Sequence, residues 1–155
     1  MTVLSPAAGD LLRAARRAVM GTVTADGRAR LVPICFWLDD RPDASEPPLI
    51  YSPLDEKRKR SADPRLLGRV RDLQARPAVT LLVDRWDEDW RRLAWLRLDG
   101  TAALLEPPRP GDDGREHERA VAGLRDRYPP YRHHHLAARP LIRIAVDRVT
   151  EWHAA

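Results

Sequence analysis

The chain has 155 residues, of which 43% are hydrophobic and 32% charged, a composition typical of one folded globular domain rather than a disordered chain. Its formal net charge of +4 permits an anionic partner, but arginines alternate with acidic residues along the whole sequence, which argues against a nucleic-acid-binding module. No apolar run approaches the roughly 20 residues of a membrane-spanning helix, and no signal-peptide pattern opens the chain, so we expect a cytoplasmic protein without membrane contact.

The first third of the chain predicts one helix followed by three strands. Ser5-Pro6 is a favourable helix start, because Ser caps the free amides and Pro suits the first turn, and the helix should run to about residue 18. Residues 19–39 read as a hairpin whose turn is Asp26-Gly27, and residues 49–53 read as a third strand. The apolar face of the helix comprises Leu11, Leu12, Ala15 and Val19.

The remainder predicts two helices and three strands. Asp63-Pro64 repeats the cap-then-proline pattern, and the nearly continuous apolar run at 78–84 indicates a central strand buried on both faces. Because hairpins dominate and strands do not alternate regularly with helices, we expect a mainly β, α+β fold. The prediction is a single antiparallel split β-barrel over residues 1–155 with about three flanking helices. The expected elements are a helix at 63–76, strands at 78–84 and 93–106 with a bend at Gly100, a helix at 115–128 and a strand at 140–152.

Pro33 lies in the middle of the second hairpin strand. Proline has no amide hydrogen to donate to a neighbouring strand, so this point is an edge, a bulge, or a place where something other than a strand lies alongside. Cys35 follows in an apolar run and reads as a small buried hydrophobic residue. As the only cysteine, it excludes an intrachain disulfide.

A basic run follows the third strand, at residues 57–60. It contains Lys57 and Lys59, the only two lysines among 27 Lys and Arg. A strand end followed by clustered cations and a capped helix can hold a phosphate, because lysine is a compact point charge that needs no bidentate partner. The alternative is a solvated surface loop, and spacing alone leaves both open.

Two other stretches attract functional readings. Residues 133–135 are three consecutive histidines, but neighbouring side chains diverge and no Cys or carboxylate completes a tetrahedral set, so we expect no metal site. Trp86 and Trp90 flank three acidic residues in a predicted loop. Such aromatics can wall a ring-binding groove or a subunit contact, or simply pin a surface loop.

An ordered set of motifs over about residues 18–106 resembles the pyridoxamine 5'-phosphate oxidase-like split β-barrel proteins, and most of all their F420-dependent oxidoreductase branch. The segments are GTVTADGRARLVPICFWLD, then LIYSPLDEKRKR, then LGRVRDLQARPAVTLLVDRWDEDWRRLAWLRLDGTAALLE. The sequences SADP and RVRDL depart from the motif that many relatives show between the cations and the helix, so the resemblance defines the position of the phosphate contact only to within a residue or two.

The resemblance implies a homodimer that binds a cofactor in a groove between its subunits, with a small-molecule substrate. The implied cofactor is coenzyme F420, with FMN as the alternative. The resemblance assigns the cofactor phosphate to Lys57, Arg58 and Lys59, the flank of the groove to Tyr51 and Ser52, and the ring to Val32, Pro33 and Ile34.

The implied activity is an F420-dependent oxidoreductase that transfers a hydride between the cofactor and a small conjugated organic substrate. No side chain can be assigned as a catalytic acid or base, because in this superfamily the cofactor carries the hydride chemistry. The alternatives are an FMN-dependent enzyme of the same fold and a non-catalytic F420-binding protein.

Overall fold

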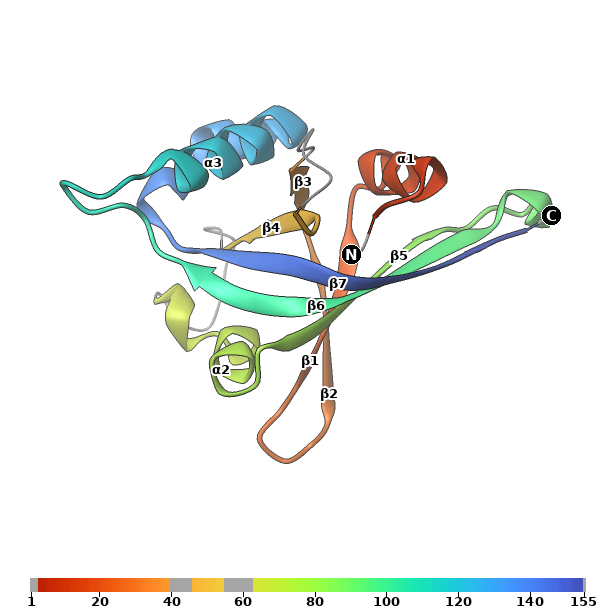
Figure 1. Ribbon diagram of the computed structural model, residues 1–155, viewed down its shortest axis with the longest axis horizontal. Coiled ribbons are helices and arrows are strands. Elements are labelled where there is room, and N and C mark those ends of the chain that lie inside the picture. Colours follow the sequence, from red (N-terminus) through yellow and green to blue (C-terminus); the bar gives the residue numbers. More distant parts are fainter. Residues whose placement is uncertain (1–2, 40–45, 55–62, 155) are drawn as a thin grey trace.

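The computed structural model describes residues 3–39, 46–54 and 63–154 of the chain, and its elements follow the expected order (Figure 1). The helices are α1 (Pro6–Ala14), α2 (Gly68–Ala75) and α3 (Arg115–Arg127). The strands are β1 (Ala18–Val23), β2 (Ala29–Ile34), β3 (Trp37–Asp39), β4 (Leu49–Pro53), β5 (Ala78–Arg85), β6 (Ala94–Leu105) and β7 (Leu141–His153). Four short 3₁₀ turns are η1 (Pro64–Leu66), η2 (Trp90–Arg92), η3 (Pro129–His133) and η4 (Leu136–Ala138).

The seven strands form one antiparallel sheet in the order β2-β1-β5-β6-β7-β4-β3. The outermost strands, β2 and β3, are joined in the chain by only Cys35 and Phe36. The sheet must therefore curl until its two edges nearly meet, which makes it a half-barrel. The predicted antiparallel split β-barrel with three helices is confirmed, and the long β5, β6 and β7 strands extend beyond the barrel as a twisted ribbon (Figure 1).

The first hairpin forms as predicted, but its second strand is shorter than expected. Gly27 adopts a φ of +83°, and the Thr24 amide donates to the Arg28 carbonyl across the turn at 2.8 Å. Strand β2 then ends at Ile34, and β3 pairs with β4 instead of β1. The predicted strand is thus divided between the two edges of the sheet, where the barrel turns its corner.

Two predicted helices were too long. Helix α1 ends at Ala14 because Arg127 donates to the carbonyls of Leu12 (3.0 Å), Arg13 (2.9 Å) and Ala15, so Val19 lies in β1 and not on the helix. The predicted helix at 63–76 is divided. Asp63 caps the turn η1, and α2 begins only at Gly68, after the extended residue Leu67.

The burial of strands β5 and β4 differs from the sequence-based prediction. Strand β5, expected to be buried on both faces, is buried only through Val79, Leu81 and Val83, and its other face is exposed. All five residues of β4 are buried instead, since β4 lies between two hydrophobic clusters. One cluster fills the barrel beneath α1 and α2, and the other lies beneath α3, where Gly123 leaves room for the Trp37 ring.

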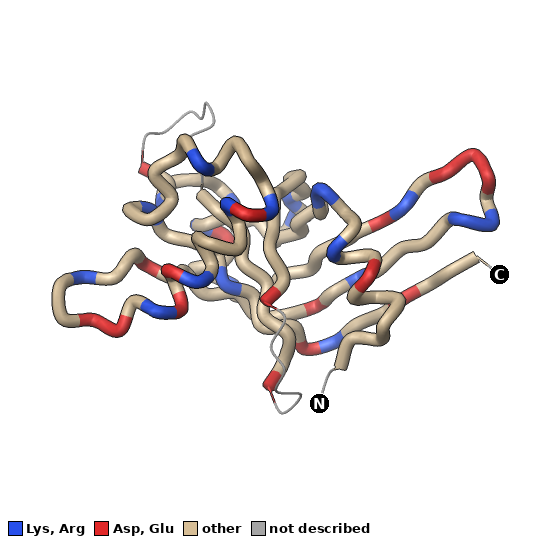
Figure 2. The backbone as a smooth tube through the Cα atoms, turned by 90° about the horizontal axis from the view of Figure 1, so that it is seen from above, with Lys and Arg blue, Asp and Glu red and all other residues tan. Residues whose placement is uncertain are grey.

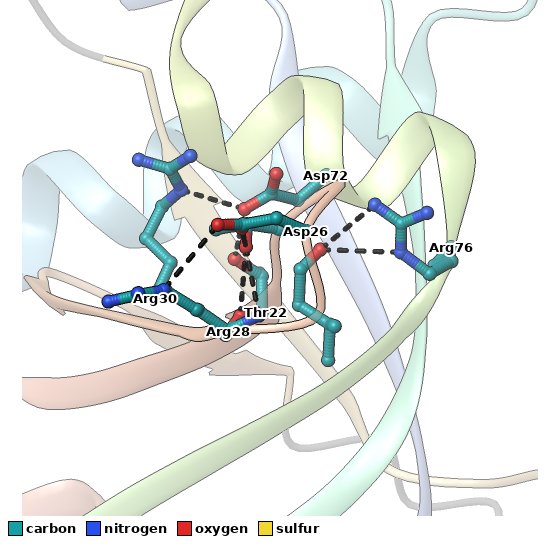
Figure 3. A network of polar contacts seen from close by, with 8 residues as sticks. Thr22, Asp26, Arg28, Arg30, Asp72 and Arg76 are labelled. Carbon is teal, nitrogen blue, oxygen red and sulfur yellow. Dashed lines mark hydrogen bonds and ion pairs between the residues drawn. The ribbon is translucent and has the colours of Figure 1, made fainter.

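A polar network ties α2 to the inner face of the first hairpin (Figure 3). The Thr22 hydroxyl and the Arg30 Nε both donate to Oδ2 of Asp72, each at 2.7 Å. Burial disfavours the Asp72 carboxylate, but the two donors outweigh it and lower the Asp72 pKa. The network therefore fixes α2 across the end of the barrel. Among the described residues, no helix is long and apolar enough to cross a membrane.

Candidate functional site

The three predicted ring-contacting residues lie on β2, an edge strand that pairs only with β1. Ile34 is buried in the barrel core, and Val32 packs against that core from a half-buried position. Pro33 is exposed and pairs across the strand with Val19. The edge position is one of the readings expected for Pro33, because a proline there leaves no ladder hydrogen bond unmade.

The predicted flanking residues, Tyr51 and Ser52, are fully buried in β4. The Tyr51 hydroxyl donates to Glu116 on α3 at 2.7 Å, and burial together with this bond raises the pKa of Tyr51 to about 12. Arg143 of β7 donates to the same Glu116 oxygen at 2.5 Å. Tyr51 thus stays protonated at neutral pH and anchors α3 to the sheet.

Ser52 connects β4 with the segment that follows β2. Its hydroxyl donates to the carbonyl of Cys35 at 3.0 Å, and Cys35 directly follows Ile34 at the end of β2. Directly after the end of β4, the carbonyl of the buried residue Leu54 accepts a hydrogen bond from Arg139 at 2.5 Å. The bond from Ser52 holds β4 beside the link between β2 and β3, two residues after Pro33.

The predicted phosphate-binding residues, Lys57, Arg58 and Lys59, lie outside the described residues, so their positions stay a prediction. The described chain stops at Leu54, beside the end of β2, and resumes at Asp63. Arg65, in the turn that follows, donates from Nε to Glu106 at 2.9 Å and ties this turn to the end of β6. The described residues on either side of the basic run, Leu54 and Arg65, are therefore each bonded to another part of the fold.

The outward face of the sheet carries a groove of about 610 Å³, here named the strand groove. One row of its residues crosses five strands in register: Leu31, Gly21, Thr80, Asp99 and Arg148. The next row on the same face is Pro33, Val19, Leu82, Arg97 and Thr150, of which Val19 and Leu82 line the groove. Leu31, Val23 and Leu82 are exposed apolar residues on this face. The volume and the apolar lining are those of a site for a ring-sized ligand.

Polar groups lie at one side of the strand groove. Asp99 accepts from the Thr80 hydroxyl at 2.7 Å and from two nitrogens of Arg148 at 3.0 and 3.1 Å. The bond from Thr80 contributes most to lowering the pKa of Asp99, so this carboxylate is ionised at neutral pH. Sequence analysis missed these residues. The alternation of Thr80, Leu82 and Asp84 in one strand was the signal that could have exposed them.

The other candidates form no catalytic cluster. His133 and His135 are exposed, and the ring of His134 packs edge-on against Tyr131 at 5.4 Å. Within the described ranges, no group of His, Cys, Asp and Glu is arranged to hold a metal ion. Cys35 is half-buried beside the second cluster rather than fully buried as expected. Basic and acidic residues are dispersed over the described backbone and form no single basic stripe (Figure 2).

Comparisons with known proteins identify the architecture. The chain aligns with a conserved hypothetical protein, Rv2991, from Mycobacterium tuberculosis (18% identity, 98% and 86% of the two chains, TM-score 0.70). It also aligns with HutZ, a heme storage protein from Vibrio cholerae (14%, 98% and 95%, TM-score 0.63), and with an F420 reductase (19%, 95% and 98%, TM-score 0.61). These identities show a shared fold, and no curated protein matches the sequence. A family model, Pyridoxamine 5'-phosphate oxidase, matches residues 4–153, so the chain belongs to the pyridoxamine 5'-phosphate oxidase family.

Proposed function

We propose that this protein is an oxidoreductase that binds coenzyme F420 and transfers a hydride between it and a small conjugated organic substrate. The family supports a flavin-type cofactor, and an F420 reductase is among the proteins of the same fold. The observation that carries the proposal is the 3.0 Å bond from Ser52 to Cys35. It holds the strand that leads into the basic run beside Cys35, two residues after Pro33 in the chain.

In this arrangement the cofactor phosphate binds to Lys57, Arg58 and Lys59, and the ring lies against Pro33 and the adjacent strand groove. Ammonium and guanidinium groups make the strong, charge-assisted hydrogen bonds that a phosphate accepts. Pro33 presents no amide hydrogen, so a flat apolar ring can lie beside it without leaving a donor unpaired. Tyr51 and Ser52 act by position, because both are buried and hold the strand end that supplies the cations.

The proposed assembly is a homodimer in which a second copy covers the strand groove. The outward face of β1, β2 and β5 exposes Leu31, Val23 and Leu82, whereas α1 and α2 pack over the inner face. Apolar residues gathered on one face are typical of a subunit contact or a ligand site. A second copy would also exclude water from a ring bound there, which favours hydride transfer.

The bound cofactor supplies the hydride chemistry, and the chain's own residues bind and orient. Tyr51 does not donate a proton at neutral pH, since its pKa lies near 12 and its hydroxyl is engaged by Glu116. Asp99 is held ionised by Thr80 and Arg148. Catalysis would therefore rest on placing the two reacting carbons about 3–3.5 Å apart in a dry groove.

The test is a fluorescence titration of the protein with F420 and FMN side by side. Replacing Lys57 and Lys59 together by Ala should weaken cofactor binding by about 2 kcal/mol, roughly thirtyfold, because charge-assisted contacts are lost. The matched control replaces Arg91 and Arg115, two exposed arginines at 83% and 87%, and removes the same charge elsewhere. Unchanged affinity in the lysine variant, or an equal loss in the control, contradicts the proposal.

The same titration separates the two alternatives. Tighter binding of FMN than of F420 would assign the protein to the FMN-dependent enzymes of the fold. Tight F420 binding without hydride transfer across a panel of conjugated carbonyl compounds would assign it to cofactor storage or delivery.

A further inference from the structure

The strands β5, β6 and β7 extend beyond the barrel as a ribbon (Figure 1), and a second groove lies on this ribbon. We name it the tryptophan groove, and its volume of about 440 Å³ is within the range of small-molecule sites. Its lining residues are Leu82, Asp84, Arg85, Trp86, Leu93, Ala94, Trp95, Arg97 and Trp152. Three indoles in one concavity are a large share of the five tryptophans in the chain.

Strand register explains how these indoles meet. Asp84, Trp95 and Trp152 are opposite one another on three adjacent strands. Cross-strand neighbours of this kind have Cβ atoms about 5 Å apart and project to the same side of the sheet. Trp86 follows the end of β5 and closes the groove beyond this row. The floor is therefore built by the regular sheet and does not depend on a loop conformation.

The charges of the groove favour an anionic or strongly hydrogen-bond-accepting ligand. Arg85 and Arg97 line it together with one acid, Asp84, so the guanidinium groups outnumber the carboxylates. Arg85 uses its Nε for the Arg92 carbonyl at 2.6 Å, and Arg97 approaches Asp99 only at 3.8 Å. Both arginines retain donors for a ligand oxygen, because a guanidinium carries five N–H groups.

The tryptophan groove meets the strand groove at Leu82, which lines both. Leu82 is opposite Val19 on one side and Arg97 on the other, and Val19 is opposite Pro33. With strands spaced about 4.8 Å apart, Leu82 lies about 10 Å from Pro33 along this row. A ligand in the tryptophan groove thus ends next to a ring that lies against Pro33.

We propose that the tryptophan groove binds a planar aromatic anion, stacked on Trp95 and Trp152 with its acidic group at Arg97. The assignment of this groove as the substrate site rests on the proposed function, because a ligand there lies near the cofactor only if the cofactor ring lies at Pro33. As a binding site it stands on the lining residues alone. Indole faces favour flat rings, and a guanidinium favours the oxygens of a carboxylate or sulfonate.

The experiment uses isothermal titration calorimetry of the cofactor-free protein with two probes of the same shape and opposite charge. We expect 2-naphthalenesulfonate to bind at least tenfold more tightly than 2-naphthyltrimethylammonium. Trp86→Ala should weaken sulfonate binding at least fivefold. Trp90→Ala is the matched control, because Trp90 is as exposed as Trp86 (69% against 70%) but does not line the groove, and it should change affinity less than twofold. Arg97→Gln should reduce the preference for the sulfonate.

Equal affinity for both probes, preference for the cation, or equal losses in the Trp86 and Trp90 variants overturns the proposal. Light scattering of each variant gives its oligomeric state. A dimer that dissociates on Trp86→Ala means that a second copy occupies the groove, and this outcome also overturns the proposal. Because the calorimetry uses cofactor-free protein, a negative result there does not affect the proposal of F420 binding. A negative F420 titration likewise does not affect the proposal of a binding site in the tryptophan groove.

Discussion

Two triads of identical composition lie on opposite faces of the curled sheet. Thr22, Arg30 and Asp72 meet on the inner face, where α2 packs over them, and the Asp72 side chain is 7% exposed (Figure 3). Thr80, Asp99 and Arg148 meet on the outward face, and the Asp99 side chain is 24% exposed. Each carboxylate accepts from one threonine and one arginine, yet only the inner triad connects a helix to the sheet.

The comparison shows that the role of a polar cluster depends on whether a helix covers it, and not on its residue types. The inner triad is a tether, because removing Asp72 leaves the buried Thr22 hydroxyl without its acceptor and breaks the link between α2 and the hairpin. The outward triad lies in the strand groove and keeps Arg148 at 71% exposure, so its members can exchange partners with water, with a ligand or with a second copy. Three experiments test this contrast.

The largest expected effect is on the free energy of unfolding when each carboxylate is removed. Asp72→Ala should destabilise the protein by about 2–3 kcal/mol, because the buried Thr22 hydroxyl loses its acceptor and Arg30 loses its ion pair. Asp99→Ala should cost about 1 kcal/mol or less, since its main ion-pair partner is solvated. Urea unfolding measures both. Similar costs for the two variants would mean that α2 does not shield the inner triad.

A smaller effect is expected when pH falls. The pKa of Asp72 is lower in the folded protein than in the unfolded chain, so its stabilising contribution is complete above about pH 4 and is lost as pH falls through the folded pKa. Urea midpoints of the wild type should therefore decline as the pH falls below about 4. Asp72→Asn should show a shallower decline than the wild type, and so should Asp99→Asn, because the pKa of Asp99 is also lowered in the folded protein. If stability declined equally steeply in Asp72→Asn and in the wild type, Asp72 would not be the cause of the decline.

The smallest effect concerns salt. Raising NaCl from 0.05 to 1 M shortens the screening length to about 3 Å and weakens exposed ion pairs more than covered ones. The stability difference between the wild type and Asp99→Asn should shrink by a few tenths of a kcal/mol, whereas that for Asp72→Asn should hardly change. The reverse order in urea unfolding at the two salt concentrations would contradict the assignment of the faces.

Local patterns predicted most of the fold. Asp26-Gly27, the bend at Gly100 and the periodicity of the third helix correspond to the observed turn, the register shift at Asp99/Gly100 and α3. The errors have tertiary causes. The carbonyls at the end of α1 are capped by Arg127, more than 100 residues away in sequence, and β4 is covered by a helix whose docking no local pattern encodes.

The site was less accessible to sequence reasoning. Pro33 was recognised from its chemistry, and the structure places it on the edge of the sheet. The burial of Tyr51 depends on Glu116, 65 residues farther along, and the outward row at Thr80 and Asp99 appears only when the strands are aligned. Alternation reveals which residues share a face, but not which face a helix will cover.

Pro33 has a consequence for how the molecule associates. An unpaired strand edge is a template on which further strands can add, and such growth leads to fibrils. Pro33 interrupts the row of donors on β2, and its ring occupies space that an incoming backbone would need. Pro33 therefore makes this edge of the sheet a poor template for the addition of a further strand.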